Sequence, residues 1–139
     1  GSPASMQNAP EYDDVLDDVY GFLEQRIRDC VAAGIGHDQI IVDPGFGFGK
    51  TLEHNLRLLN NLDRLHKLGV PQLVGTSRKS MIDHLLNRSV DERLAGGLAT
   101  VAIGVQKGAQ LFRGHDVKDT VDVVRMTEAV MNEGRIDND

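Results

Sequence analysis

Apolar residues recur along this chain at two different spacings, and the alternation between them predicts helices and strands in turn. Between residues 13 and 33 the apolar positions follow helical spacing, and Gly34 supplies a stop signal. These positions are Val15, Val19, Phe22, Ile27, Cys30 and Val31. The short apolar run 39–42 then predicts a buried strand. Residues 1–10 are polar without periodicity, so they predict a loop that leads into the first helix.

The same alternation continues through the middle of the chain. Thr51 is placed to cap a second helix, which Gly69 ends. The apolar positions of this helix are Leu52, Leu56, Leu59, Leu62, Leu65 and Leu68. A short strand is predicted at 72–75, followed by a loop and a short helix at 77–87.

Two further elements complete the pattern. Ser89 and Glu92 match a capping box for a helix that runs to residue 107, with Gly108 behind it. A strand at 109–112 follows, and Asp116 can cap a last helix. The apolar positions of that helix are Val117, Val121, Val124 and Val130. Residues 132–139 are expected to form a disordered tail.

The order of elements predicts an α/β fold in which three parallel βα units follow a leading helix. Residues 1–139 are expected to form a single domain. An eight-unit (β/α)8 barrel needs about 250 residues, so three strands can form only part of one. A small open sheet of three strands is the alternative.

Composition narrows the functional classes. A formal charge of −6 argues against a general nucleic-acid binder, which needs a surplus of Lys and Arg. The single cysteine, Cys30, cannot form an internal disulfide and is expected to be a buried, inert thiol in a reducing cytoplasm. No apolar run approaches the length of a membrane span, so no membrane association is expected.

Reactive polar residues directly follow each predicted strand, and the carboxyl ends of parallel strands are where ligands bind. After the first strand, Asp43 precedes a glycine-rich loop, 44–49. The glycines allow a tight turn that would point Asp43 into the mouth of the sheet and leave one Phe free to cover a flat ligand. An ordinary turn that Asp43 initiates before Pro44 is the competing interpretation.

The end of this loop also resembles a nucleotide-binding loop, because Gly49, Lys50 and Thr51 stand between a strand and a helix. The pattern fails where a first glycine is required. That position is Pro44, which has no N–H to offer a phosphate. A nucleotide- or phosphate-binding domain, or a purely structural fragment, remains as an alternative function.

Two cationic clusters follow the other strands. Ser77, Arg78, Lys79 and Ser80 stand at a predicted helix start, where free N–H groups and the helix dipole favour anions. Arg113 and His115 are two residues apart at a strand end, so they can face the same side and clamp an anion. The other histidines are interpreted as structural, and no metal-ligand spacing is present. Together the clusters suit a planar heterocycle and two anionic groups.

These residues resemble the dihydropteroate synthase family of folate biosynthesis, specifically its C-terminal half. The resemblance runs from about residue 5 to residue 131. It is carried by Asp-Pro-Gly-Phe-Gly-Phe-Gly-Lys at 43–50, Ser-Arg-Lys-Ser at 77–80 and Arg-Gly-His-Asp at 113–116. The family's enzymes are TIM barrels that join para-aminobenzoate to 6-hydroxymethyl-7,8-dihydropterin pyrophosphate, giving dihydropteroate and pyrophosphate, and they are targets of sulfonamides.

The resemblance implies a role for each site residue. Asp43 and Lys79 would hold the pterin ring, with Gly75 close to it. The residues Phe48, Arg78 and Ser80 would border the aminobenzoate site, and Arg113 and His115 would grip the pyrophosphate. Lys79, Arg113 and His115 would then be the catalytic residues. The leaving pyrophosphate needs stabilisation more than the reaction needs a strong base.

The resemblance also implies what this chain does not supply. The family's magnesium ligand, its other pterin-binding residues and its two mobile loops match nothing here, so we expect the isolated chain to be inactive and no residue of it to bind the metal. The family dimerises through helices that correspond to residues 92–107 and 120–131. We therefore expect a homodimer or larger oligomer, in which two half-barrels could also pair.

Overall fold

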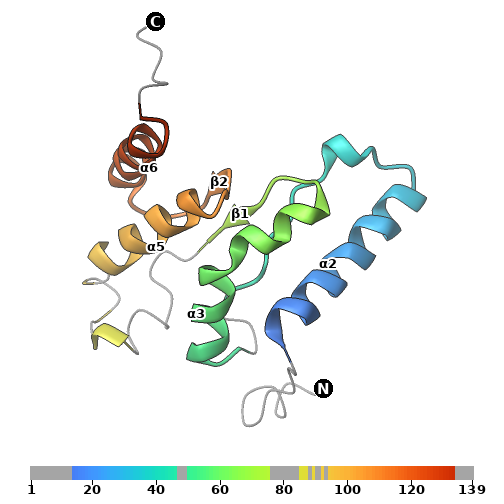
Figure 1. The fold of residues 1–139 in the computed structure, drawn as a ribbon, viewed down its shortest axis with the longest axis horizontal. Coiled ribbons are helices and arrows are strands. Elements are labelled where there is room, and N and C mark those ends of the chain that lie inside the picture. Colours follow the sequence, from blue (N-terminus) through green and yellow to red (C-terminus); the bar gives the residue numbers. More distant parts are fainter. Residues whose placement is uncertain are drawn as a thin grey trace, which may run out of the picture.

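The computed structural model describes residues 14–46, 50–75, 85–87, 89, 92 and 94–133. Helices and short strands alternate along these residues, and Figure 1 shows the helices following one another across the molecule in chain order. The elements are α2 (Val15–Ala32), η1 (His37–Gln39), α3 (Leu52–Asn60), η2 (Leu62–Leu68), β1 (Leu73–Val74), α5 (Leu94–Gln106), β2 (Leu111–Phe112) and α6 (Val117–Met131). The predicted α/β alternation is therefore confirmed.

The sheet is parallel, as predicted, and shorter than predicted. β1 and β2 pair with Leu73 opposite Leu111 and Val74 opposite Phe112. A single parallel bridge from Val42 to Gln72 adds the first segment on the other side of β1. The three segments thus lie side by side in chain order, and a right-handed βα crossover connects parallel neighbours of this kind.

The strand predicted at 39–42 is wrong except for Val42. Gln39 ends a 3-10 turn: its N–H donates to the carbonyl of Gly36 (2.9 Å), and its side-chain oxygen accepts from the N–H of Gly36 (3.0 Å). Because these groups are used in the turn, the segment enters the sheet late. Only Val42 reaches it, with its N–H donating to Pro71 and its carbonyl accepting from Leu73.

The leading helix is confirmed as α2, but its core face differs from the predicted one. Asp14 caps the helix by accepting from the N–H of Leu16 at 3.0 Å. Phe22, predicted to face the core, is 64% exposed, and Val31 is also exposed. The buried face is Val15, Leu16, Val19, Leu23 and Ile27. Steps of four residues lead from Val15 to Ile27 through Leu23, which leaves Phe22 on the flank. Cys30 is half-buried against the core rather than buried.

The second predicted helix is two helices. Thr51 caps α3 by accepting from the N–H of His54 at 3.1 Å, as predicted. The α-helix ends at Asn60, and a 3-10 helix, η2, continues to Leu68 before Gly69 turns the chain at φ 75°. Three residues per turn is the 3-10 period, so it places Leu62, Leu65 and Leu68 on one buried face.

The third and fourth helices begin and end near their predicted limits. α5 begins at Leu94, and Gly108 follows it at φ 93°. Ser89 and Glu92 do contact each other, with the Ser89 hydroxyl donating to the Glu92 carboxylate at 3.0 Å, but they precede the first turn of α5 instead of capping it. Asp116 is the N-cap residue of α6 without a side-chain cap bond.

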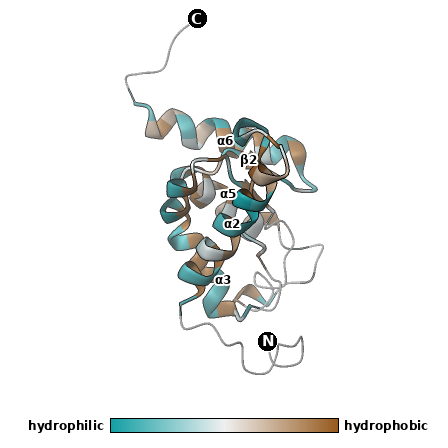
Figure 2. Cartoon of the chain, turned by 90° about the vertical axis from the view of Figure 1, so that its right-hand side faces the viewer, coloured by the Kyte–Doolittle hydropathy of each residue, from teal (hydrophilic) through white to brown (hydrophobic). Residues whose placement is uncertain are grey.

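The apolar positions of α6 do not form a core. α6 packs beside α5, yet none of its residues is buried. Val117 and Val130, two of the apolar positions of the predicted helix, are 67% and 62% exposed. Figure 2 shows apolar residues along α6, which lies at the edge of the molecule. Over the described part of the chain, no helix combines the length and apolar character needed to cross a membrane.

Candidate functional site

The three parallel segments end at one edge of the sheet, and a polar or small residue follows each end. Asp43 follows the Val42 bridge, Gly75 follows β1, and Arg113 follows β2. The ladder continues one step beyond β2, since the N–H of Arg113 donates to the carbonyl of Val74 at 3.0 Å. The register therefore sets Gly75 directly beside Arg113. The structure brings these three predicted residues together.

The side chain of Arg113 crosses the end of β1 and reaches Asp43. Its Nη1 lies 3.5 Å from Oδ2 of Asp43, with side chains 59% and 40% exposed. The guanidinium lies over Gly75 on the way: a Cβ added at Gly75 would be 2.8 Å from Cζ of Arg113. Any side chain larger than hydrogen at position 75 would overlap the guanidinium. The sequence identified both residues but did not predict this contact.

Asp43 also initiates a turn, as the competing interpretation of this residue predicted, and its role in binding a ligand stays a prediction. Its Oδ1 accepts from the N–H of Gly45 at 2.9 Å, which fixes the carboxylate orientation. The loop continues into Phe46, which is buried in the core. Phe46 is therefore not the aromatic residue free to cover a ligand, and Phe48 lies outside the described residues.

Lys50 folds back onto the same loop. Its Nζ donates to the carbonyl of Gly45 at 2.7 Å. Burial lowers the pKa of the Lys50 ammonium, and the nearby Asp43 carboxylate partly offsets that change. Thr51 uses its hydroxyl to cap α3. These contacts argue against the nucleotide-loop alternative, in which Lys50 and Thr51 would face a phosphate and its metal ion.

Of the other predicted site residues, the structure describes only His115. It is exposed and follows Gly114 in the bend before α6. That His115 and Arg113 face the same side stays a prediction. Phe48 and the cluster Ser77, Arg78, Lys79 and Ser80 lie outside the described residues. Among the residues that the structure does describe, no three His, Cys, Asp or Glu side chains are grouped to hold a metal ion.

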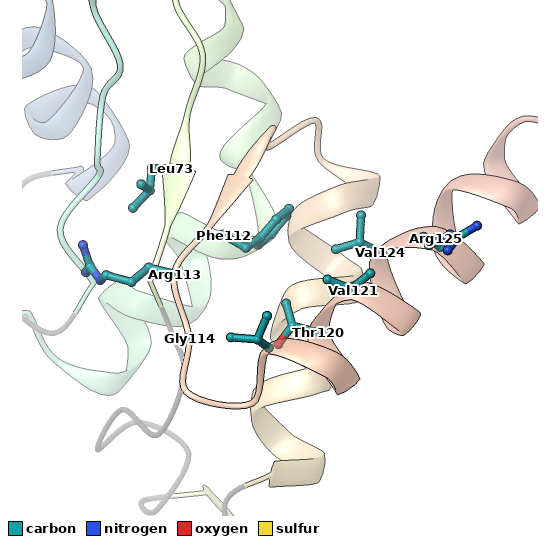
Figure 3. Close-up of a pocket in the computed structure, with 9 residues that line it drawn as sticks. Leu73, Phe112, Arg113, Gly114, Thr120, Val121, Val124 and Arg125 are labelled. Carbon is teal, nitrogen blue, oxygen red and sulfur yellow. The ribbon is translucent and has the colours of Figure 1, made fainter.

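A cavity of about 470 Å³ lies between β2 and α6, and we did not expect it from the sequence. It is lined by Leu73, Phe112, Arg113, Gly114, Val117, Thr120, Val121, Val124 and Arg125. In Figure 3, Phe112 points toward the helices α5 and α6, whereas the guanidinium of Arg113 points to the opposite side of the strand. Successive residues alternate across a strand, so Phe112 and the Arg113 guanidinium lie on different sides of β2. The sequence signal for this cavity was the helical spacing of Val117, Val121 and Val124, which alone does not show what that face lies against.

The family model described as "Pterin binding enzyme" matches residues 1–115 of this chain. The chain therefore belongs to the pterin-binding enzyme family. Among curated relatives, it is similar to dihydropteroate synthase of Escherichia coli K12, with 48% identity over 132 residues. That match covers 95% of this chain and 47% of the relative, so the chain spans about half the length of the curated relatives it matches.

Solved structures agree with this family. The structure is similar to Yersinia pestis dihydropteroate synthase in complex with a sulfonamide drug, with a TM-score of 0.90 and 46% identity over 95% of this chain and 48% of the other. It is also similar to dihydropteroate synthase from Thermus thermophilus in complex with 4-aminobenzoate, with a TM-score of 0.84 and 41% identity over 94% of this chain and 53% of that one. The resemblance to dihydropteroate synthase is thereby confirmed over the length of this chain.

Proposed function

We propose that this chain forms the C-terminal half of a dihydropteroate synthase barrel and carries one side of its active site. The observation that supports this most directly is the convergence of Asp43, Gly75 and Arg113 at one end of parallel strands, where α/β enzymes bind ligands. The enzyme would be a transferase. The carbon–oxygen bond to the diphosphate breaks, pyrophosphate leaves, and the aminobenzoate amine forms the new carbon–nitrogen bond and loses a proton.

In this proposal Asp43 binds the pterin. Its carboxylate is exposed at the strand end and oriented by Gly45, so it can accept hydrogen bonds from the amine and ring N–H of a pterin. An ionised acceptor strengthens such bonds relative to neutral pairs. Lys79 would be the second pterin-binding residue, with Gly75 close to the ring. Gly75 is buried at the end of β1.

Arg113 and His115 bind the pyrophosphate. The guanidinium of Arg113 offers a planar fork of donors at an exposed position, which suits phosphate oxygens. Donors held in place before bond breaking stabilise the negative charge that grows on the leaving group. The family resemblance implies that Phe48, Arg78 and Ser80 border the aminobenzoate, and the Thermus relative is a complex with 4-aminobenzoate.

The described residues form no magnesium site by themselves. Asp43 is the only carboxylate in contact with Arg113 in the described site, and the N–H of Gly45 also bonds to it. We propose that the magnesium ion implied by the resemblance is held by residues other than these. A cytoplasmic location is part of the proposal, supported by a single half-buried cysteine, because reducing compartments keep thiols free.

We also propose that the chain needs a partner. The apolar residues exposed on α6 are Val117, Val121, Met126, Val130 and Met131. So many exposed apolar residues on one helix are costly in water and suit a protein interface. A homodimer through the regions 92–107 and 120–131 would cover some of them.

The exposure of Asp43 and Arg113 means that a ligand between them would be covered on one side only. We therefore propose that the 139-residue polypeptide binds pterin but does not turn over substrates alone. Pyrophosphate release with both substrates and magnesium should stay at background, while 6-hydroxymethylpterin binding is detectable by fluorescence.

The variant Asp43→Asn should weaken that binding about tenfold or more, because it removes a charged acceptor. The variant Asp38→Asn removes an exposed acid from the turn η1 and should leave pterin binding unchanged. Turnover by the polypeptide would overturn the proposed inactivity. Equal pterin binding by both variants would overturn the assignment of Asp43, and a chain that binds neither pterin nor pyrophosphate would be a structural fragment.

A further inference from the structure

We propose that the Asp43–Arg113 ion pair couples the pterin and pyrophosphate subsites, so that each ligand strengthens binding of the other. The inference rests on the proposed function, which gives Asp43 to the pterin and Arg113 to the pyrophosphate. It goes further because each residue competes with the ligand of the other: Arg113 competes with the pterin for Asp43, and Asp43 competes with the pyrophosphate for Arg113. The observation behind it is the direct contact between the two side chains, which belong to different strand ends.

The geometry makes each ligand compete with the pair. Arg113 donates to Oδ2 of Asp43 while the N–H of Gly45 already bonds to Oδ1. Both carboxylate oxygens therefore have a partner, and a pterin N–H that bonds to Oδ2 competes with Arg113 for that oxygen. A pyrophosphate that takes the guanidinium leaves Oδ2 available. Coupling between two binding sites is reciprocal. The pterin must therefore raise the pyrophosphate affinity by the same factor by which pyrophosphate raises the pterin affinity.

The exposure of the pair limits the size of this coupling. Side chains that are 59% and 40% exposed form an ion pair screened by water, and the distance of 3.5 Å is at the long end of a hydrogen bond. Exposed pairs contribute little, so we expect a coupling factor of about two to five at low salt. Salt screens such a pair, and the factor should fall toward one in about 1 M salt.

Gly75 holds the pair in reach by leaving room for the guanidinium. A methyl group at this position would overlap Arg113, whose Cζ would lie 2.8 Å from it. The strain is relieved by moving the end of a flexible side chain. The backbone accepts alanine, because Gly75 is absent from the described glycines with positive φ. Gly75→Ala thus separates the charges of the pair without removing either one.

The test is titration calorimetry on the 139-residue chain at low salt, with 6-hydroxymethylpterin and inorganic pyrophosphate as probes. Saturating pyrophosphate should raise the pterin affinity about two- to fivefold, and saturating pterin should raise the pyrophosphate affinity by an equal factor. Gly75→Ala should bring the ratio to one, whatever its effect on the pterin affinity itself. A factor of one or below in the wild type would overturn the inference while leaving the proposed function intact.

A second comparison keeps the test independent of Gly75. Asp43→Asn should bind pyrophosphate about two- to fivefold more tightly than the wild type, because Arg113 is no longer paired with a charge. Asp119→Asn removes an equal charge from the exposed first turn of α6 and should leave the pyrophosphate affinity unchanged. An equal gain in pyrophosphate affinity in both variants would mean that the net charge of the chain, not the ion pair, causes the effect. That result would overturn the coupling. Failure of the wild type to bind either probe would remove the proposed function and the inference with it.

Discussion

The guanidinium of Arg113 lies 3.5 Å from the carboxylate of Asp43, although 70 residues separate them in the chain. The contact joins the ends of the first and third parallel segments and crosses the second at Gly75. Parallel strands set side by side bring their carboxyl ends together, so residues of different motifs meet there. This contact therefore joins residues from separate sequence motifs in one site.

Asp14 should stabilise the fold in a pH-dependent way. Its carboxylate accepts two bonds from Arg57, at 3.1 and 3.3 Å, and one from the N–H of Leu16. The Arg57 guanidinium, with help from Leu16, lowers the Asp14 pKa below its ordinary value of 3.8. A lowered pKa in the folded state contributes stability above that ordinary value, and the contribution is lost as the pH falls through the folded pKa.

We therefore expect Asp14→Asn to lower the thermal midpoint at pH 7, with a difference from wild type that shrinks below pH 3.8. Asparagine is also a good N-cap residue, so the substitution isolates the charge. Asp122→Asn, on exposed α6, should have no effect. Thermal unfolding followed by circular dichroism across pH tests this, and a difference that does not vary with pH would contradict it.

Gly108 should tolerate no side chain. It has φ 93°, and a Cβ there would overlap the ring of His66, whose Nε2 lies 3.0 Å from the carbonyl of Lys107. Gly108→Ala should cost about 1 kcal/mol or more of unfolding free energy. Gly21 lies in the middle of α2, and a Cβ added there would meet no atom within 4 Å. Gly21→Ala should instead raise the free energy of unfolding by about 0.5–1 kcal/mol. Urea titration compares them, and a stabilised Gly108→Ala would contradict the observed turn.

Leu62 should be a larger contributor to the core than its neighbour Leu56. Leu62 is 0% exposed on the inner face of η2, whereas Leu56 is 38% exposed on α3. Leu62→Ala should cost about 2–5 kcal/mol, because it removes buried contacts and leaves a cavity. Leu56→Ala should cost less than about 1 kcal/mol. Denaturant unfolding of both variants measures this, and equal costs would mean that η2 does not lie against the core as described.

Self-association should depend on the exposed apolar residues of α6. Val130 is 62% exposed on that helix, and a charge there would oppose burial in a dimer. We expect Val130→Glu to shift the chain from dimer toward monomer in light scattering, without loss of helical signal. Glu128→Gln, two residues away, should leave the dimer intact. A wild-type chain that stays monomeric at high concentration would rule out the proposed homodimer.

The sequence predicted the elements better than their details. Helix stops at Gly34, Gly69 and Gly108 were readable because each glycine adopts positive φ, which other residues avoid. The split of the second helix was not predicted, although leucines spaced by three already fit the 3-10 period of η2. Helical spacing shows which residues share a face but not whether another element covers it, so the spacing in α6 did not predict its exposure; only the dimer contact expected from the family resemblance pointed to an uncovered surface there.

In the candidate site, too, single residues were predicted but the contacts between them were not. Asp43, Gly75 and Arg113 were identified one by one, because a reactive residue directly after a strand is a local signal. Their contact depends on the register of β1 and β2 and on the room above Gly75. Register depends on how distant segments pair, so it cannot be predicted from the sequence of one segment alone.

The most direct test of the proposed site is pyrophosphate binding by Arg113 variants, measured by titration calorimetry on the 139-residue chain. Arg113→Met should weaken pyrophosphate binding about tenfold or more, since it removes charge-assisted hydrogen bonds. Arg113→Lys should retain part of the affinity, because a point charge replaces the planar fork. Arg125→Met removes an equal charge from α6, across the cavity that both arginines line, and should bind like the wild type. Arg113→Met and Arg125→Met binding pyrophosphate equally well would contradict the account.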